Sequence, residues 1–140
     1  LDQVTDIGVM TSDGRKRPGR VIRKDRKQDL VLIRTAERFS SALSVSDGRI
    51  RLKKGERIYV LTCAEGERKI LTGLVSGPVT LQGNLLLWQV EMDTPRGSSG
   101  SPVFDRDGKL LGIIKGRYRG NSSIGFLIPL ETVAAFLHEE

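Results

Sequence analysis

The sequence places a serine between two glycines near position 99, within the run RGSSGSP that occupies residues 96–102. A serine hydroxyl acts as a nucleophile when a base removes its proton and when N–H groups stabilise the charge that forms on the attacked oxygen. Gly97 permits backbone conformations that a Cβ forbids, so the amides of Gly97 and Ser99 can converge on one anionic oxygen, and Gly100 leaves the space beside the hydroxyl open. The run therefore predicts a nucleophile loop around Ser99, with a surface turn rich in Gly and Ser as the alternative.

A nucleophilic serine also needs an acid that orients its base, and Asp29 is the candidate for this role. Asp29 directly precedes the apolar run Leu30–Ile33, so its carboxylate would stand at the mouth of a buried strand. An exposed carboxylate in the turn at 27–29 is the alternative, and the residues alone leave it open.

Short strand-like runs, separated by turn signals, continue through most of the chain. The Asp-Gly pair at 13–14 suits a tight hairpin turn, and the regular spacing of such turns predicts an all-β sandwich or barrel. Only after Pro129 does the period change to that of a short amphipathic helix, with an apolar stripe of Leu130, Val133, Ala134 and Leu137. We expect strands at 7–10, 19–23, 30–33, 49–52, 57–63, 69–76, 85–90, 102–104, 109–114 and 124–128.

The composition is that of a soluble globular domain, with 38% hydrophobic and 29% charged residues among 140 and a net charge of +6. Residues 1–35 hold nine basic and five acidic side chains but no aromatic residue, which favours a solvated charged hairpin over a nucleic-acid surface. No apolar run is long enough to span a membrane, so we expect no membrane contact from these residues.

One cysteine and one histidine, Cys63 and His138, do not make a metal site, and we expect no metal and no cofactor. The apolar residues before Cys63 predict a small buried strand residue rather than a reactive thiol. His138 is expected to be a surface side chain near the end of the helix.

Two segments resemble parts of a known enzyme family. Asp29–Arg34 resembles the aspartate segment of trypsin-like serine proteases, especially the bacterial HtrA/Deg group, and Gly97–Pro102 resembles their nucleophile segment. Ser12–Arg15 resembles the hairpin before the aspartate, Thr72–Ser76 a strand of the second barrel, and Gly125–Pro129 the strand ahead of the C-terminal helix. The likeness runs from residue 1 to about residue 138, with the motifs in family order.

This resemblance implies two six-stranded antiparallel Greek-key barrels and a short C-terminal helix, with the N-terminal barrel incomplete in these residues. It divides the chain into the remainder of the N-terminal barrel at about 1–42, the C-terminal barrel at about 43–129 and the helix at 130–138.

The resemblance makes Ser99 the nucleophile, Asp29 the orienting acid, and the amides of Gly97 and Ser99 the donors of the oxyanion hole. Asp93, six residues before Ser99, stands where some trypsin relatives place the floor of a pocket that selects a basic side chain. A peptide substrate is expected to add as an antiparallel strand along Ile114, Lys115, Gly116 and Arg117.

One departure from the family pattern concerns the general base. The family histidine would fall about two residues before Leu1, and the one histidine present, His138, stands where the family has no catalytic group. The base then lies outside these residues, the protein is a pseudoprotease, or a second chain completes the barrel by strand exchange.

We expect a serine endopeptidase domain whose histidine lies outside this chain, with an inactive protease-like peptide-binding or scaffold domain as the alternative. The 140 residues alone are expected to be inactive in hydrolysis. The resemblance further implies a peptide or unfolded-protein substrate, a homo-oligomer and a bacterial cell-envelope or periplasmic location, although these residues hold no targeting signal.

Overall fold

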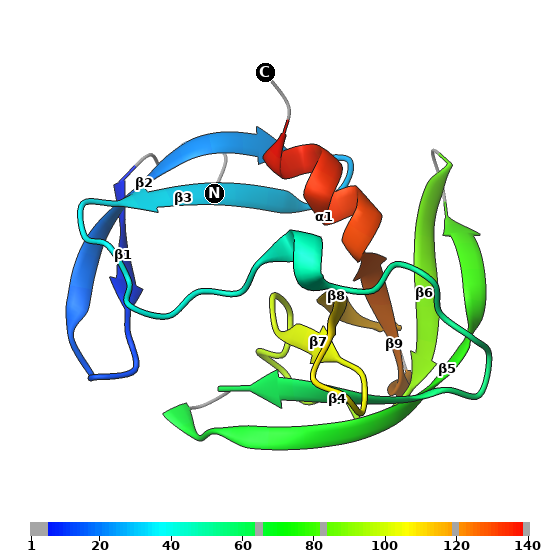
Figure 1. Cartoon of the computed structure of the whole chain (residues 1–140). Coiled ribbons are helices and arrows are strands. Elements are labelled where there is room, and N and C mark those ends of the chain that lie inside the picture. Colours follow the sequence, from blue (N-terminus) through cyan, green and yellow to red (C-terminus); the bar gives the residue numbers. More distant parts are fainter. Residues whose placement is uncertain (1–5, 64–65, 82–83, 119–120, 139–140) are drawn as a thin grey trace. The chain divides into compact units, whose positions relative to one another are not determined.

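The structure is a computed structural model that describes residues 6–63, 66–81, 84–118 and 121–138. The chain forms two compact units, of which the first ends at Ala42 and the second begins at Leu43. Strands dominate both units, and one short helix follows the last strand (Figure 1). The predicted β fold with a C-terminal helix is confirmed.

The first unit is a three-stranded antiparallel sheet in the order β1-β2-β3, with β1 at Asp6–Met10, β2 at Lys16–Asp25 and β3 at Leu30–Thr35. The predicted hairpin turn between β1 and β2 is present. Gly14 adopts a φ of 81° there, and the Asp13 carboxylate accepts the N–H of Arg15 at 3.0 Å.

One face of this sheet carries apolar side chains that are only half-buried, namely Ile7, Val9, Val21 and Ile33. Among residues 6–42, only Gly19 is buried. The described residues therefore make an open sheet in this unit, and the six-stranded first barrel that the resemblance implies is represented by three strands.

The second unit contains a closed six-stranded barrel in the order β4-β5-β6-β9-β8-β7. Every neighbouring pair is antiparallel. Its strands are β4 (Arg57–Thr62), β5 (Lys69–Leu81), β6 (Leu85–Glu91), β7 (Pro102–Phe104), β8 (Leu110–Tyr118) and β9 (Asn121–Pro129).

Alternating residues of these strands point into the barrel and form its core. Ile58, Val60, Val90, Val103 and Leu127 are all fully buried at 0% exposure. Each such side chain stabilises the fold by about 1.5–3 kcal/mol relative to an exposed one. The core thus makes the second unit a rigid support for the loop that carries Ser99.

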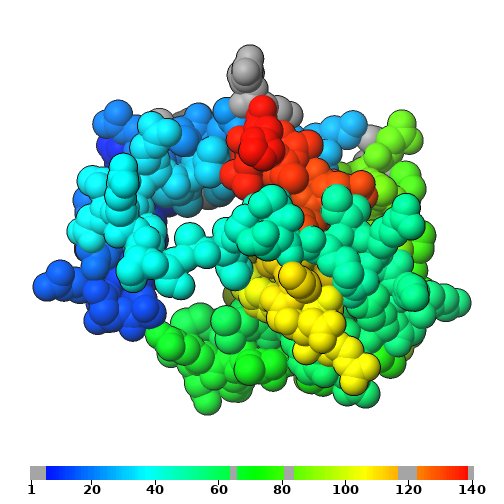
Figure 2. Space-filling view, in the orientation of Figure 1, coloured from blue at the N-terminus to red at the C-terminus, as the bar shows by residue number. Residues whose placement is uncertain are grey.

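The helix α1 (Leu130–Leu137) begins directly after β9 and packs on β8, β9 and the 3-10 turn η1 (Val45–Asp47). Figure 2 shows α1 in red at the surface, above the segment that contains η1. Leu130 and Val133 are buried as predicted, but the third buried residue is Phe136, because Leu137 ends the helix and is 36% exposed.

Two expectations about the second unit are wrong. Arg49–Leu52 is not a strand, because other strands close the barrel and Arg49 instead joins the turn after β7. Cys63 is exposed, because Ile58, Val60 and Thr62 are the inward-pointing residues of β4 and alternation turns the next residue outward.

Candidate active site

Ser99 lies in the loop between β6 and β7, within two consecutive tight turns. The first turn closes with the Ser98 N–H donating to the Pro95 carbonyl at 3.3 Å, and the second with the Ser101 N–H donating to the Ser98 carbonyl at 3.0 Å. Gly97 and Gly100 occupy the third positions of these turns with φ of 86° and 90°. Positive φ at the third position is the mark of a type II turn, which explains why glycine stands at both places.

Strand β8 holds the second turn in place. The Gly100 N–H donates to the Ile114 carbonyl at 2.7 Å, and the Ile114 N–H donates to the Ser101 carbonyl at 2.9 Å. The Ser99 side chain is exposed, and its Oγ donates to the carbonyl of Lys115 at 2.9 Å. The hydroxyl is therefore accessible at a defined position on the rim of the barrel, but its proton is directed at a carbonyl that cannot act as a base.

The two amides predicted to bind an oxyanion are accessible. Within the part of the chain that the structure describes, neither the Gly97 N–H nor the Ser99 N–H donates to a backbone or side-chain acceptor. Both residues are exposed. An N–H pair left unbonded by the protein is what an oxyanion hole requires before substrate arrives.

The predicted substrate edge lies in β8, which extends past the end of β7. β7 pairs with β8 only as far as Ile113, while Gly116 and Arg117 pair with β9 on the other side. Ile114 already exchanges hydrogen bonds with the serine loop, and the Lys115 carbonyl accepts from Ser99. At Gly116 and Arg117, the side of β8 that faces away from β9 therefore pairs with no strand of the described residues.

The segment before Ser99 places Thr94, rather than Asp93, inside the protein. Asp93 is exposed, whereas Thr94 is 1% exposed and its Oγ1 donates to the Met92 carbonyl at 3.1 Å. A Cβ on Gly125 would lie 3.0 Å from Thr94 Oγ1, and a Cβ on Gly116 would lie 3.4 Å from Ser99 Oγ. Glycines in β8 and β9 thus let both strands approach the serine loop closely.

Asp29 belongs to the first unit, where it ends the turn between β2 and β3. It is exposed and has a φ of 61°, a left-handed conformation that Asp tolerates better than most residues. A neighbouring hydrogen bond, in which the Gln28 N–H donates to the Asp25 carboxylate at 3.0 Å, shapes this segment. His138 is in the second unit, exposed at the C-terminal cap of α1.

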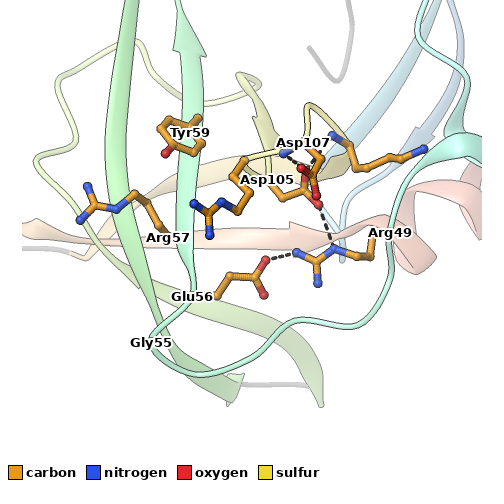
Figure 3. Close-up of a pocket in the computed structure, with 9 residues that line it drawn as sticks. Arg49, Gly55, Glu56, Arg57, Tyr59, Asp105 and Asp107 are labelled. Atoms are coloured by element: carbon orange, nitrogen blue, oxygen red, sulfur yellow. Dashed lines mark hydrogen bonds and ion pairs between the residues drawn. The ribbon is translucent and has the colours of Figure 1, made fainter.

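A separate hollow of about 730 Å³ lies at the turn after β7 and contains an ionic cluster (Figure 3). Asp105, which is 6% exposed, accepts the N–H groups of Asp107 and Lys109 at 2.9 Å each and the Arg49 Nε at 3.0 Å. Arg49 also forms an ion pair with Glu56. Each of these three charged side chains has a partner of opposite charge. The cluster therefore links the β7–β8 turn to the segment before β4 and stabilises the fold.

Burial of Asp105 opposes its ionisation. The N–H of Lys109, the Arg49 guanidinium and the N–H of Asp107 stabilise the charged form more strongly, so the pKa of Asp105 lies below its ordinary value of 3.8. Asp105 is consequently ionised at neutral pH and acts as an acceptor, which is the behaviour of a structural carboxylate rather than of a general acid.

Sequence reasoning missed the structural roles of Ser98 and Thr94, whose buried hydroxyls both donate to backbone carbonyls. The signal available for Ser98 was its place directly before the proposed nucleophile. Among the described residues, no group of three or more His, Cys, Asp or Glu side chains could hold a metal ion. The one described helix is too short to cross a membrane.

The closed six-stranded barrel and the loop that carries Ser99 agree with the family that the sequence matches. Residues 1–113 match the family described as trypsin-like peptidase domain, and the chain belongs to that family. Proteases named do-like, DegP or HtrA-like are among the curated proteins that this chain is similar to.

Two of the curated proteins that this chain is similar to are named as serine proteases. A probable serine protease do-like from Buchnera aphidicola is 28% identical over 145 residues, which cover 95% of this chain and 30% of that protein. Periplasmic serine endoprotease DegP of Escherichia coli K12 is 29% identical over 142 residues, again covering 95% of this chain and 30% of the relative. The chain therefore spans less than a third of the length of these curated relatives.

Among solved structures, the active form of the Rv3671c protease from M. tuberculosis is similar, with a TM-score of 0.82 and 19% identity. The likeness covers 94% of this chain and 62% of that chain. At this level of identity the likeness shows the fold.

Proposed function

We propose that this chain is part of a serine endopeptidase that cleaves peptide bonds by acyl transfer through Ser99. The observation that carries the proposal is the exposed Ser99 hydroxyl beside the N–H groups of Gly97 and Ser99, which have no acceptor among the described residues. A nucleophile and a pair of unbonded amides in one rigid loop are the two parts of an acyl-transfer site that the second unit supplies.

In this mechanism Ser99 Oγ bonds to the carbonyl carbon of the substrate while its proton passes to a base. The carbonyl electron pair moves to oxygen, and the amides of Gly97 and Ser99 donate to that oxygen. The C–N bond then breaks as the nitrogen takes the proton from the base, and water releases the acyl group by the same steps. Losing one such amide donor typically lowers kcat by about 10²–10³-fold.

We assign the base to a histidine outside these 140 residues and its orienting acid to Asp29. The Ser99 hydroxyl supports this assignment, since it donates to the Lys115 carbonyl at 2.9 Å, and a carbonyl cannot accept the proton. The place of Asp29 directly before β3 also supports its assignment, because the family segment that these residues resemble carries its aspartate at that place.

The substrate is a peptide or an unfolded protein that adds to β8 as a strand. The uncovered edge at Gly116 and Arg117 supports this, with Ile114 and Lys115 anchoring the same strand to the serine loop. Asp93 is exposed close to this loop and is proposed to favour a basic side chain before the cleaved bond. The similarity to a periplasmic bacterial endoprotease further favours a periplasmic bacterial enzyme, and we extend the proposal to a homo-oligomer.

A fluorophosphonate probe tests the proposal on the full-length protein that contains these residues. We expect labelling of Ser99, loss of labelling in Ser99→Ala, and full labelling in Ser46→Ala, whose exposed serine lies in η1. The isolated 140-residue chain should stay unlabelled because it lacks the base. An unlabelled full-length protein, beside a control protease that reacts, would favour the alternative of an inactive peptide-binding or scaffold domain.

A further inference from the structure

Ser98, the residue before the proposed nucleophile, is buried at 1% exposure although its side chain is polar. Its Oγ donates to the Pro95 carbonyl at 2.6 Å, and its N–H donates to the same oxygen at 3.3 Å. A buried hydroxyl requires such a partner, because desolvation without a hydrogen bond is unfavourable. The side-chain bond has an ordinary length for an O–H···O bond, whereas 3.3 Å is long for an N–H···O bond, so the hydroxyl makes the better-formed of the two bonds.

Ser98 also links the two turns of the loop. It is the last residue of the Pro95–Ser98 turn and the first residue of the Ser98–Ser101 turn. The Gly97 N–H belongs to the first turn, and the Ser99 N–H follows the Ser98 carbonyl directly. A rotation of the Ser98 backbone would therefore change the angle between the two amides that must point at one oxygen.

The two turns are held very differently. Strand β8 secures the second turn through the paired bonds between Gly100, Ser101 and Ile114. Among the described residues, the two bonds from Ser98 to Pro95 are the only hydrogen bonds that reach residues 95–97. Ser98 consequently supplies the hydrogen bonds that, among the described residues, hold the turn containing Gly97.

We propose that Ser98 is the positioning residue of the oxyanion hole, and that its buried hydroxyl holds the Gly97 amide in line with the Ser99 amide. The inference rests on the proposed function of Ser99. Ser98 touches no reacting atom, since it acts on the reaction only through the turn that contains Gly97.

The rate of fluorophosphonate reaction in the full-length protein tests this role. Ser99 Oγ forms a bond to phosphorus while the P–F bond breaks, fluoride leaves with the bonding electrons, and the Oγ proton passes to the base. We expect Ser98→Ala to react at least about tenfold more slowly, which stays within the loss known for a complete oxyanion donor. Ser98→Thr keeps the hydroxyl and should recover most of the rate.

The matched control is Ser101→Ala, which removes another buried serine of the same loop. Ser101 bonds to its neighbours through its backbone, so this variant should react within about twofold of the wild type. The urea unfolding midpoints of Ser98→Ala and Ser101→Ala are measured beside the rates, so that any loss of stability is separated from the loss of reactivity. The inference would be overturned if the labelling rate of Ser98→Ala falls no more than its loss of stability explains. It would also be overturned if the labelling rate falls equally in Ser98→Ala and Ser101→Ala.

A second measurement does not depend on catalysis. In the ¹⁵N-labelled full-length protein, the heteronuclear NOE of Gly97 reports motion of its amide on the ps–ns timescale. We expect it to fall in Ser98→Ala and to stay unchanged in Ser101→Ala. An unchanged value in Ser98→Ala would contradict the inference.

The two proposals can fail separately. A full-length wild type that never reacts refutes the function of Ser99, and the role of Ser98 in holding the turn is then decided by the NOE. A reactive wild type with an equally reactive Ser98→Ala leaves the function intact and refutes the role of Ser98.

Discussion

Arg49→Met removes the cation shared by Asp105 and Glu56 while it keeps much of the aliphatic length of the side chain. Hydrogen bonds to charged groups contribute about 1.5–3 kcal/mol to stability. The side chain of Asp105 is only 6% exposed, so we expect the loss of its 3.0 Å bond to Arg49 to cost a free energy in the upper part of this range. The Glu56 pair adds less, because Arg49 is itself 34% exposed and water can replace it. We expect the free energy of unfolding to fall by about 2–3 kcal/mol.

Urea unfolding followed by Trp88 fluorescence measures this loss. Trp88 is the only tryptophan of the 140 residues and packs against the barrel core. Arg57→Met is the matched control, because Arg57 lines the same hollow but is exposed and has no ion pair among the described residues. It should change the unfolding free energy by less than about 0.5 kcal/mol.

Acid should weaken the same interaction. The pKa of Asp105 is lowered in the folded protein, so its stabilising contribution is complete above the unfolded value near 3.8 and is lost as the pH falls through the lower folded value. The difference between wild type and Arg49→Met should therefore shrink below about pH 3.8. The reasoning is refuted if Arg49→Met costs no more than Arg57→Met, or if a double-mutant cycle with Asp105→Asn shows no coupling between the two residues.

Three further variants or reagents test the barrel. Gly112→Ala should lower the free energy of unfolding by about 3 kcal/mol or more, since the new Cβ would lie 2.1 Å from a backbone carbonyl oxygen. Gly55→Ala is the control: its Cβ meets open space, so only its φ of 85° should cost about 1–2 kcal/mol. Equal urea midpoints for the two variants would contradict this prediction. Leu87→Ala should lower the free energy of unfolding by about 2–5 kcal/mol, because Leu87 is fully buried. Leu86 is 43% exposed, so Leu86→Ala should cost less than about 1 kcal/mol. A larger fall in Tm for Leu86→Ala than for Leu87→Ala would contradict the burial of Leu87. Cys63 should react fully with a maleimide in the native protein, as mass spectrometry would show, and a protected thiol would contradict its exposure.

Local features of the fold followed from the sequence with little help from distant residues. The Asp13-Gly14 turn needs only a glycine that accepts positive φ, and the short helix after Pro129 needs only the change of apolar period. The wrong assignment of a strand before β4 had a non-local cause. Arg49–Leu52 alternates like a strand, but the ion pairs of Arg49 lie with Asp105 and Glu56, which no periodicity reveals.

For the candidate site, the sequence by itself determined the residue types: the serine between two glycines, and the aspartate ahead of an apolar strand. These are matters of local chemistry, because a nucleophile, an acid and a glycine can each be read at one position. Only the tertiary structure decided that β8 pins the loop at Ile114, that the Ser99 hydroxyl meets the Lys115 carbonyl, and that Ser98 turns inward to hold Pro95. Hydrogen bonds across the barrel depend on which strands close it, and that choice is made by packing of the whole core rather than by any one segment.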